Sequence, residues 1–182
     1  MFSLMEGNVL LFLQEFVRNP LLNMFFIFVT GLGDKGFIWI LAAILLLLRK
    51  KHRKEGVTVL LALGIGFVIT NLLLKNIVAR PRPYTILTEL EILIPKPSDY
   101  SFPSGHTCSS FAAALAMLKV CDRKIGIFAC VLAVLIAFSR LYVGVHYPTD
   151  VLAGALLGTV SALIAVWSMK RWYKIKNIER NY

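Results

Sequence analysis

SRLYVGVHYPTD, residues 139–150, places an arginine, a histidine and an aspartate between two long apolar segments. The flanking segments, 125–138 and 151–169, have the composition of membrane-spanning helices. Ionisable side chains at the edge of a membrane are costly, so each of them is a candidate functional residue. This stretch therefore predicts a membrane fold that carries a site at the membrane edge.

The composition favours an integral membrane protein. Of the 182 residues, 58% are hydrophobic and 16% are charged, whereas soluble domains carry about a quarter charged residues. The length predicts one domain over residues 1–182. The net charge of +10 would favour nucleic acid in a soluble protein, but the basic residues lie in short clusters between apolar segments. We therefore expect no nucleic-acid partner, and the sequence indicates no obligate protein partner.

The N-terminus and the cysteines argue against processing and cross-linking. Residues 1–6 lack a basic region and no small-residue cleavage site follows, so we expect no cleaved signal peptide. Cys108, Cys121 and Cys130 lie in or beside apolar helical segments without a Cys-x-x-Cys spacing. This pattern predicts packing residues rather than a disulfide framework or a zinc site.

The hydropathy pattern predicts an all-α polytopic helix bundle with six transmembrane helices and an N-terminal amphipathic interfacial helix. Residues 8–18 have the spacing of that interfacial helix, with an early start of the first span as the alternative. The first span is short, since at about 1.5 Å per residue it reaches roughly 20 Å. Residues 31–36 predict a tight turn to the second span. The spans are expected over residues 20–32, 37–48, 57–78, 104–120, 125–141 and 147–169.

The basic residues predict the orientation of these spans. Residues 49–54, the Arg123-Lys124 turn and the C-terminal tail fall on one side, which the positive-inside rule makes cytoplasmic. Six spans put both termini and Arg18 there too. The opposite, extracellular or periplasmic side receives the loop 79–103. Within that loop the apolar stretch 86–94 has several interpretations: it rests on the membrane surface, covers the site, borders the entry of the lipid, or packs as an ordinary loop.

Three clusters on the outer side have the chemistry of a phosphate site. They are Lys75-x6-Arg82-Pro83, Pro103-Ser104-Gly105-His106, and the 139–150 stretch with Arg140. Lysine and arginine supply three fixed positive charges, and arginine forks suit phosphate oxygens. Ser104 and Gly105 begin a helix, where free backbone N–H groups and the helix dipole favour an anion. The predicted phosphate-binding residues are Lys75, Arg82, Ser104, Gly105 and Arg140.

Two histidines and one aspartate supply the elements of phosphoryl transfer. A neutral imidazole at His146 can attack phosphorus, and Asp150, four residues on, can hold its tautomer. Pro148 suits a first helical turn, so His146 can precede the helix and the pairing is not dictated by helix geometry. His106 is the available acid for the leaving oxygen, and later the base that activates water. No ligand cluster indicates a metal, so we expect neither metal nor cofactor.

Each cluster alone has a simpler interpretation. A single lysine or arginine at the end of a span is usually a snorkelling anchor. Pro-Ser-Gly-His can be a loop with a helix cap, and His-x3-Asp can be a satisfied pair. Three such clusters on one side, with complementary chemistry, favour the site. His52 lies in a basic run and is expected to be a solvated cytoplasmic residue.

Together the three motifs resemble the signature of the type 2 phosphatidic acid phosphatase family, membrane lipid phosphate phosphatases related to vanadium haloperoxidases. Every signature position is present. The resemblance implies that His146 is the nucleophile, that Asp150 supports it and that His106 protonates the leaving group. It also implies that no metal takes part and that phosphate is bound by Lys75, Arg82, Ser104, Gly105 and Arg140. The haloperoxidase branch is soluble, which the predicted spans disfavour.

We therefore expect a metal-independent phosphatase in the cell membrane that acts on a lipid at the outer face. The small size resembles bacterial members that act on phosphatidylglycerophosphate, undecaprenyl diphosphate, phosphatidic acid or diacylglycerol pyrophosphate. The alternative is a transporter or flippase of phosphorylated lipids with a related pocket, which would need the cations but not the histidines and the aspartate. A purely structural membrane protein would leave the three clusters unexplained. The signature residues address the phosphate and do not distinguish among these lipids.

Overall fold

The computed structural model describes residues 2–179, and these residues form helices joined by turns and loops without any strand. The prediction of an all-α fold is therefore confirmed for this part of the chain. The long helices are α2 (Pro20–Leu32), α3 (Phe37–Leu48), α4 (Arg53–Phe67), α7 (Gly105–Val120), α8 (Arg123–Tyr142) and α9 (Pro148–Glu179). The short helices are α1 (Phe2–Phe12), α5 (Lys75–Val78) and α6 (Pro83–Ile86), with π-helical segments at Leu13–Val17 and Val68–Leu74.

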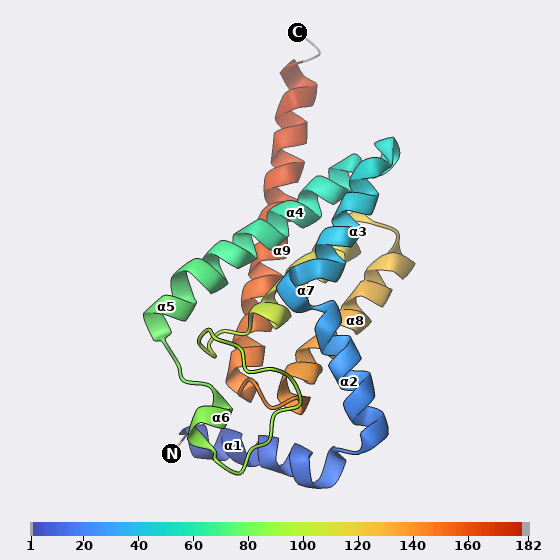
Figure 1. Ribbon diagram of the computed structural model, residues 1–182. Helices are drawn as coiled ribbons and strands as arrows, with labels where there is room; N and C mark the ends of the chain where they lie inside the picture. Colours follow the sequence, from blue (N-terminus) through green and yellow to red (C-terminus); the bar gives the residue numbers. More distant parts are fainter. Residues whose placement is uncertain (1, 180–182) are drawn as a thin grey trace.

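Helix α7 is the centre of the bundle, with α4, α8 and α9 packed around it (Figure 1). It is rich in alanine and serine, and small side chains let helices in a membrane approach closely. The helices around α7 have glycine at the positions where they come closest to it. A Cβ at Gly158 would lie 2.4 Å from the Cys108 carbonyl oxygen, and one at Gly126 would lie 2.4 Å from the Leu118 Cα. Glycine therefore lets the neighbouring helices approach the backbone of α7 closely.

The outside of the bundle is apolar along most of its length. The segments Lys50–Ile86, Arg123–Tyr142 and Pro148–Lys174 are each long and apolar enough to cross a membrane. Their outward side chains stay exposed instead of packing inside, which suits contact with lipid chains. Examples are Phe67, Phe128, Val134, Leu156 and Leu163.

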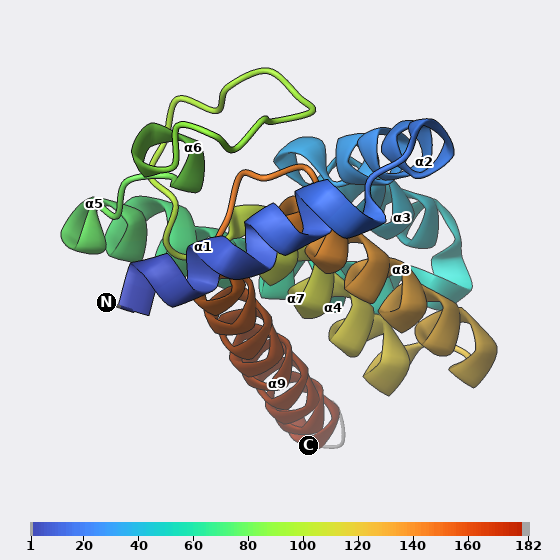
Figure 2. The same cartoon turned by 90° about the horizontal axis from the view of Figure 1, so that it is seen from below.

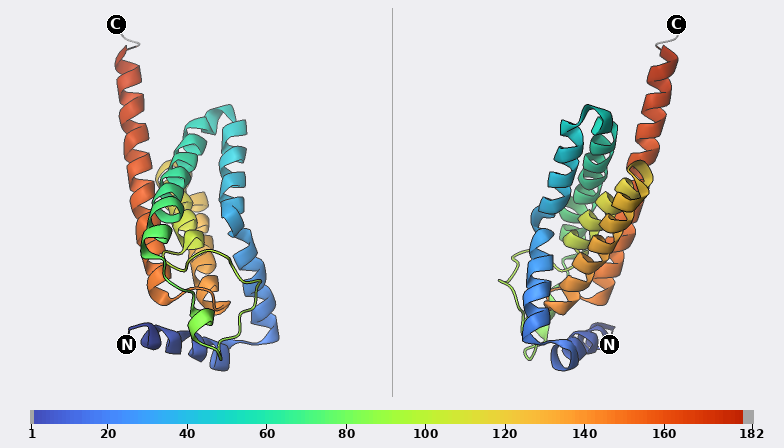
Figure 3. Two further views of the ribbon diagram at one scale, coloured as in Figure 1. Left: turned by 60° about the vertical axis from the view of Figure 1, so that its left-hand side comes forward. Right: turned by 90° about the vertical axis from the view of Figure 1, so that its right-hand side faces the viewer.

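Helices α2 and α3 form one bent pass through the bundle. They meet the criterion of length and apolarity only as a pair, and the pair bends by 46° at a short break. Two views show the second helix carrying on from the first toward the same end (Figures 1 and 3). The prediction of six spans is therefore not confirmed: three segments meet the criterion, or four if α2 and α3 form one span. The physical reason is that helices of 13 and 12 residues are each too short to cross a bilayer core.

If α2 and α3 are one pass, the described segment before residue 20 lies at the other end of the bundle from the one predicted. Helix α1 lies across the end that carries α6 and the loop after it (Figure 2). Arg18, at the end of this segment, donates to the Tyr142 carbonyl at 2.8 Å and the Glu91 carbonyl at 2.7 Å. The prediction that Arg18 and the N-terminus lie on the side of the C-terminal tail is therefore wrong. The interfacial position of α1 stays a prediction.

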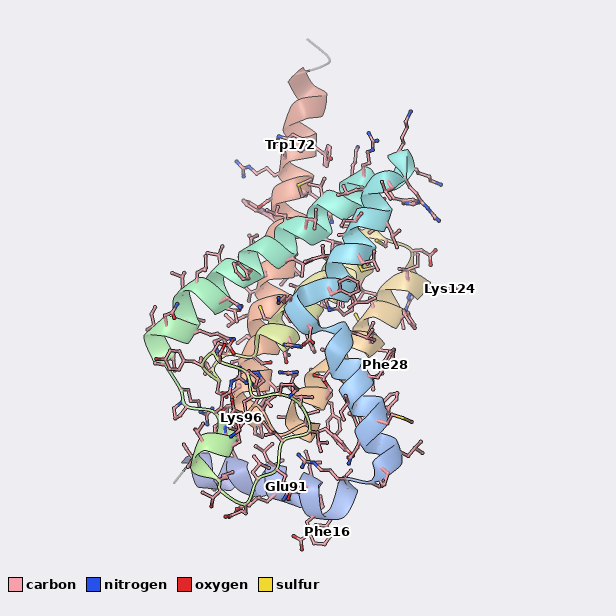
Figure 4. The ribbon with its side chains drawn as sticks, in the orientation of Figure 1. Phe16, Phe28, Glu91, Lys96, Lys124 and Trp172 are labelled. Carbon is pink, nitrogen blue, oxygen red and sulfur yellow. The ribbon has the colours of Figure 1, made fainter. Side chains whose placement is uncertain are left out.

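The two ends of the bundle differ in charge and in structure. The basic residues 49–54, the Arg123-Lys124 turn and the C-terminal part of α9 lie at one end, where Figure 4 labels Lys124 and Trp172. The opposite end carries α1, α6, the loop 87–104 and the turn 143–147, and there Figure 4 labels Phe16, Glu91 and Lys96. Residues 180–182 of the predicted tail lie outside the described residues. Every predicted site residue belongs to the second end.

Candidate active site

The site is assembled where helices begin or end at this second end. Lys75 starts α5, Arg82 precedes α6, and Arg140 lies in the last turn of α8. Ser104 caps α7, accepting from the Thr107 N–H at 3.4 Å, and Gly105 follows it. The structure brings all eight predicted residues together. Six of them line a cavity of about 470 Å³, namely Lys75, Arg82, Gly105, His106, Arg140 and His146.

Ser104 and Asp150 lie behind this cavity. The Ser104 N–H donates to the Asp150 carbonyl at 3.0 Å, which joins the start of α7 to the start of α9. Both side chains are fully buried. A Cβ at Gly154 would lie 2.6 Å from the Ser104 carbonyl oxygen, so the close approach of α9 sets the position of this helix start. Ser104 thus holds the amide end of α7 against the cavity.

His146 has its two ring nitrogens in different surroundings. Nδ1 lies 3.6 Å from an Asp150 carboxylate oxygen, and Nε2 lies 3.3 Å from Nη1 of Arg82. A guanidinium N–H can only donate, so the contact requires Nε2 to be the acceptor nitrogen, with a free lone pair. Burial, and then the positive charges of Arg82 and Arg140, lower the pKa of His146 to about 3. Asp150 raises the pKa but does not offset these effects. The imidazole is therefore neutral at neutral pH.

Asp150 is held by several donors at once. Ser101 donates to its carboxylate at 2.5 Å, the Tyr147 N–H at 2.9 Å and Arg80 at 2.7 Å. Because α9 begins at Pro148, the carboxylate reaches back over the turn to His146. The pairing therefore comes from the turn and its donors, in agreement with the expectation that helix geometry does not dictate it.

Arg80 is a residue that the sequence interpretation left without a role. It donates to Asp150 at 2.7 Å and to Glu6 of α1 at 2.6 Å, and its guanidinium lies 3.9 Å from the centre of the Tyr147 ring. Glu6 also accepts from the Thr149 N–H at 2.8 Å. A signal was available, because Arg80 is a basic residue on the outer side that no signature position accounted for. The N-terminal helix is thereby tied to the Asp150 carboxylate.

Lys75, Arg82 and Arg140, the three cations of the signature motifs, differ in their hydrogen-bond partners. Arg82 donates to the Asp99 carboxylate at 2.6 Å and to its carbonyl at 2.8 Å, and Lys75 pairs with the same carboxylate. Arg140 donates to Thr30, but its Nε is buried without a hydrogen-bond partner among the described residues. A buried guanidinium N–H that lacks an acceptor is costly, and an oxyanion in the cavity would satisfy it.

His106, in the first turn of α7, contacts a carboxylate that the sequence interpretation also missed. Its Nε2 lies 2.8 Å from an Asp34 oxygen, in the break between α2 and α3. Residues 31–36 were predicted as a turn between two spans, which gave Asp34 no reason to meet a histidine 72 positions away. Asp34, Arg80 and Asp99 therefore add three charged groups to the predicted set.

A second, mostly apolar cavity adjoins the charged one. It has a volume of about 700 Å³ and lies between α3, α4 and α7. The two cavities share Lys75, Asp99, Gly105 and His106. The rest of its lining includes Ile40, Leu60, Leu63, Phe67 and Cys108. A ligand with a charged head and an apolar chain matches this pair of cavities.

The apolar stretch 86–94 is engaged elsewhere. Leu87 and Leu90 pack with Leu10 and Tyr147, and residues 92–94 pack near Tyr142 in a neighbouring cluster. Only Ile94 of this stretch lines the charged cavity. Of the interpretations left open for it, ordinary loop packing describes these contacts.

Comparison with known sequences identifies the family. Residues 55–174 match the sequence profile of the PAP2 superfamily. The chain belongs to this superfamily. An undecaprenyl-diphosphatase of Sulfolobus acidocaldarius is 36% identical to this PAP2 protein over 174 residues, covering 95% of this chain and 83% of the relative. The resemblance inferred from the three motifs is therefore confirmed.

Solved PAP2 structures share the fold. The chain is similar to LpxE of Aquifex aeolicus, with a TM-score of 0.73 and 32% identity over 82% of this chain and 88% of that one. It is also similar to a PAP2-type phosphatidylglycerolphosphate phosphatase of Bacillus subtilis, with a TM-score of 0.74 and 27% identity over 91% and 85% of the two chains. Because the chain belongs to the PAP2 superfamily and its relatives are phosphatases, this PAP2 protein is a membrane enzyme that hydrolyses phosphate esters.

Proposed function

We propose that this enzyme removes phosphate from the head group of a membrane lipid through a phosphohistidine at His146. The observation that carries the proposal is the position of His146 between Asp150 and Arg82, at a cavity with three cations. The adjoining apolar cavity of about 700 Å³ supports a lipid rather than a water-soluble ester. No step of this mechanism is assigned to a metal.

The first chemical step transfers the phosphoryl group to the enzyme. Lys75, Arg82 and Arg140 bind the phosphate oxygens and stabilise the charge that gathers on them. The Nε2 lone pair of His146 forms a bond to phosphorus while the bond from phosphorus to the leaving oxygen breaks. His106, in its protonated form, gives a proton to that oxygen. Asp150 stabilises the resulting cationic ring of His146.

The second step returns the enzyme to its starting form. A water oxygen attacks phosphorus, the bond from phosphorus to Nε2 of His146 breaks, and His106 takes a proton from the water. Inorganic phosphate then leaves. The proton given in the first step is thereby recovered in the second, so the cycle needs only lipid phosphate and water.

Asp99 pairs with Lys75 and Arg82, and removing its charge should tighten anion binding. Burial raises its pKa, but hydrogen bonds and charges from Lys75 and Arg82 outweigh this and lower the pKa to about 2. The ion pair is thus lost only as the pH falls through about 2, so the carboxylate competes with phosphate at any working pH.

Asp99→Asn should lower the inhibition constant of orthovanadate by roughly tenfold. Glu89→Gln removes a charge from the same loop without a contact to these cations and should leave that constant unchanged. A weaker inhibition in Asp99→Asn would instead mean that Asp99 holds the cations in place.

We further propose that a polyprenyl diphosphate is the substrate. The undecaprenyl-diphosphatase of Sulfolobus acidocaldarius, whose alignment covers 95% of this chain, supports this choice. The lipid head would occupy the charged cavity, and the start of the chain the apolar one. Phosphatidylglycerophosphate is the second candidate, supported by the similar Bacillus subtilis phosphatase.

The site is proposed to face the extracellular or periplasmic side. The basic residues 49–54 and the Arg123-Lys124 turn lie at the opposite end of the bundle, which the positive-inside rule makes cytoplasmic. The described N-terminal segment then lies on the outer side and the C-terminal tail inside. Ser98 is exposed in the loop near the site. Ser98→Cys should therefore react with a membrane-impermeant thiol reagent in intact cells. Labelling that occurs only after lysis would instead indicate that the site faces the cytoplasm.

Phosphate release by the purified enzyme across a panel of lipids tests the function. The panel contains undecaprenyl diphosphate, phosphatidylglycerophosphate, phosphatidic acid and diacylglycerol pyrophosphate, each with and without EDTA. We expect turnover with undecaprenyl diphosphate to exceed the others and EDTA to leave it unchanged. Loss of activity with EDTA would contradict the metal-free mechanism. Movement of lipid between leaflets of proteoliposomes without phosphate release would support the transporter alternative instead.

A further inference from the structure

We propose that Asp34 is a positioning residue for the acid of this reaction: it holds Nε2–H of His106 so that Nδ1 delivers the proton to the leaving oxygen. The inference rests on the proposed function and adds a second carboxylate–histidine pair to the site. Asp150 serves the nucleophile, and Asp34 serves the acid. The two pairs come from different parts of the chain, the turn before α9 and the break between α2 and α3.

The contact between Asp34 and His106 is direct and specific. The Asp34 Oδ1 lies 2.8 Å from Nε2 of His106. Asp34 stands at a helix break, where a short carboxylate often caps the next helix, yet neither the following turn nor α3 has a side-chain cap. Among the described residues the carboxylate therefore has its hydrogen bond with the histidine. Both residues line the charged cavity.

The backbone of the break is shaped around the imidazole. A Cβ at Gly33 would lie 2.8 Å from Cδ2 of His106 and 2.9 Å from Cγ2 of Ile136, so the main chain itself lies against the ring. Lys35 and Gly36 adopt left-handed conformations, with φ of 51° and 72°. A lysine in this region is unfavourable. Non-helical backbone inside a membrane bundle is tolerated where it lines a cavity, and here it presents Asp34 to the site.

The charges around His106 explain why an acid at this position needs a carboxylate. Lys35 and Lys75 line cavities that it shares, and Arg140 and His146 line the charged one. Positive charges disfavour a protonated imidazole, while Asp34 and the more distant Asp99 favour it. With Nε2–H held by Asp34, Nδ1–H is the proton that passes to the leaving oxygen as its bond to phosphorus breaks. In the second step Nδ1 takes the proton from water.

Asp34→Asn should lower kcat/KM, which reports the steps up to departure of the leaving group, only where that group needs a proton. With a lipid phosphomonoester, whose alcohol would leave as an alkoxide if it received no proton, we expect a loss of about 10- to 100-fold in kcat/KM. With p-nitrophenyl phosphate, whose phenolate leaves without protonation, the loss in kcat/KM should stay within about threefold. Removal of the anion disfavours the protonated acid, so the alkaline limb of the kcat/KM profile for the lipid should move to lower pH. Asp34→Glu keeps the carboxylate and should restore part of the lipid rate.

Controls separate this role from folding and from the proposed activity. Asp122→Asn makes the same change at the N-cap of α8, at the other end of the bundle, and should leave both rates unchanged. Equal losses on both substrates, or an unmoved pH profile, would overturn the positioning role. So would a kcat/KM for the lipid that Asp34→Asn leaves unchanged. His146→Ala should lose turnover of both substrates, and if it does not, the proposed nucleophile fails while the leaving-group test of Asp34 still stands.

Discussion

His146→Ala should abolish phosphate release while the protein stays folded. Removal of an attacking nucleophile typically costs several orders of magnitude, and we expect a loss of at least about 10³-fold in kcat. The fold should survive because the pKa of His146 is about 3, so the substitution removes no charge at neutral pH. Its neighbours keep other partners: Arg82 retains Asp99 and the Val145 carbonyl, and Asp150 retains Arg80 and Ser101.

The measurement is the rate of phosphate release from one lipid substrate by the purified enzyme in detergent, with thermal unfolding recorded for each variant. His52→Ala is the matched control, since His52 is a half-exposed histidine that pairs with Glu55 at the other end of the bundle. It should retain full activity. An active His146→Ala would remove the phosphohistidine from the mechanism. Acid-labile labelling of the wild type by substrate phosphate, absent from the variant, would support it directly.

The signature residues could be predicted because their chemistry lies at helix boundaries that the sequence marks. Pro103 and Ser104 mark the start of α7, and Pro148 marks the start of α9. The apolar segments then bring these starts to one end of a bundle whatever the details of packing. The joining of α2 and α3 into one bent pass left this end intact, because both helices precede Lys75. The site was therefore less sensitive to the topology than the N-terminus was.

The bend between α2 and α3 could not be predicted from the same information. Gly-Leu-Gly-Asp-Lys-Gly suits a turn that reverses the chain as well as one that bends it. The difference depends on the left-handed backbone of Lys35 and Gly36 and on the packing of Gly33 against His106. That contact joins residues far apart in sequence, and no local periodicity reports it.

The additional charged residues were missed for a related reason. Asp34 meets His106, and Glu6 meets Arg80, across 72 and 74 positions. Asp99 lies in a loop without periodicity, although it is only 17 positions from Arg82. The sequence analysis counted one acidic residue in the signature clusters, whereas the folded site contains three more around them. Signature motifs predict the groups that address phosphate, and the groups that balance those charges emerge only from the fold.

Gly158→Ala should destabilise the protein strongly, whereas Gly64→Ala should not. Alanine favours a helix over glycine by up to about 1 kcal/mol, so propensity alone predicts stabilisation at both positions. At Gly158 a Cβ would lie 2.4 Å from the Cys108 carbonyl oxygen and 2.8 Å from the Phe111 Cβ. Backbone cannot move aside like a flexible side chain, so α9 must separate from α7. We expect a cost of about 3 kcal/mol or more. Gly64, in α4, has nothing within 4 Å of its Cβ position.

Unfolding of both variants in detergent, by heat or by titration with a denaturing detergent, measures the difference. The destabilised variant should also lose activity at temperatures where it remains folded, because Gly154 of the same contact holds the Ser104 carbonyl close to α9. A shift between α7 and α9 therefore moves Ser104 and the helix amides away from the phosphate. Equal melting temperatures for the two variants would mean that α7 and α9 tolerate separation. The position of the anion site would then depend on the loops alone, rather than on a glycine contact in the centre of the bundle.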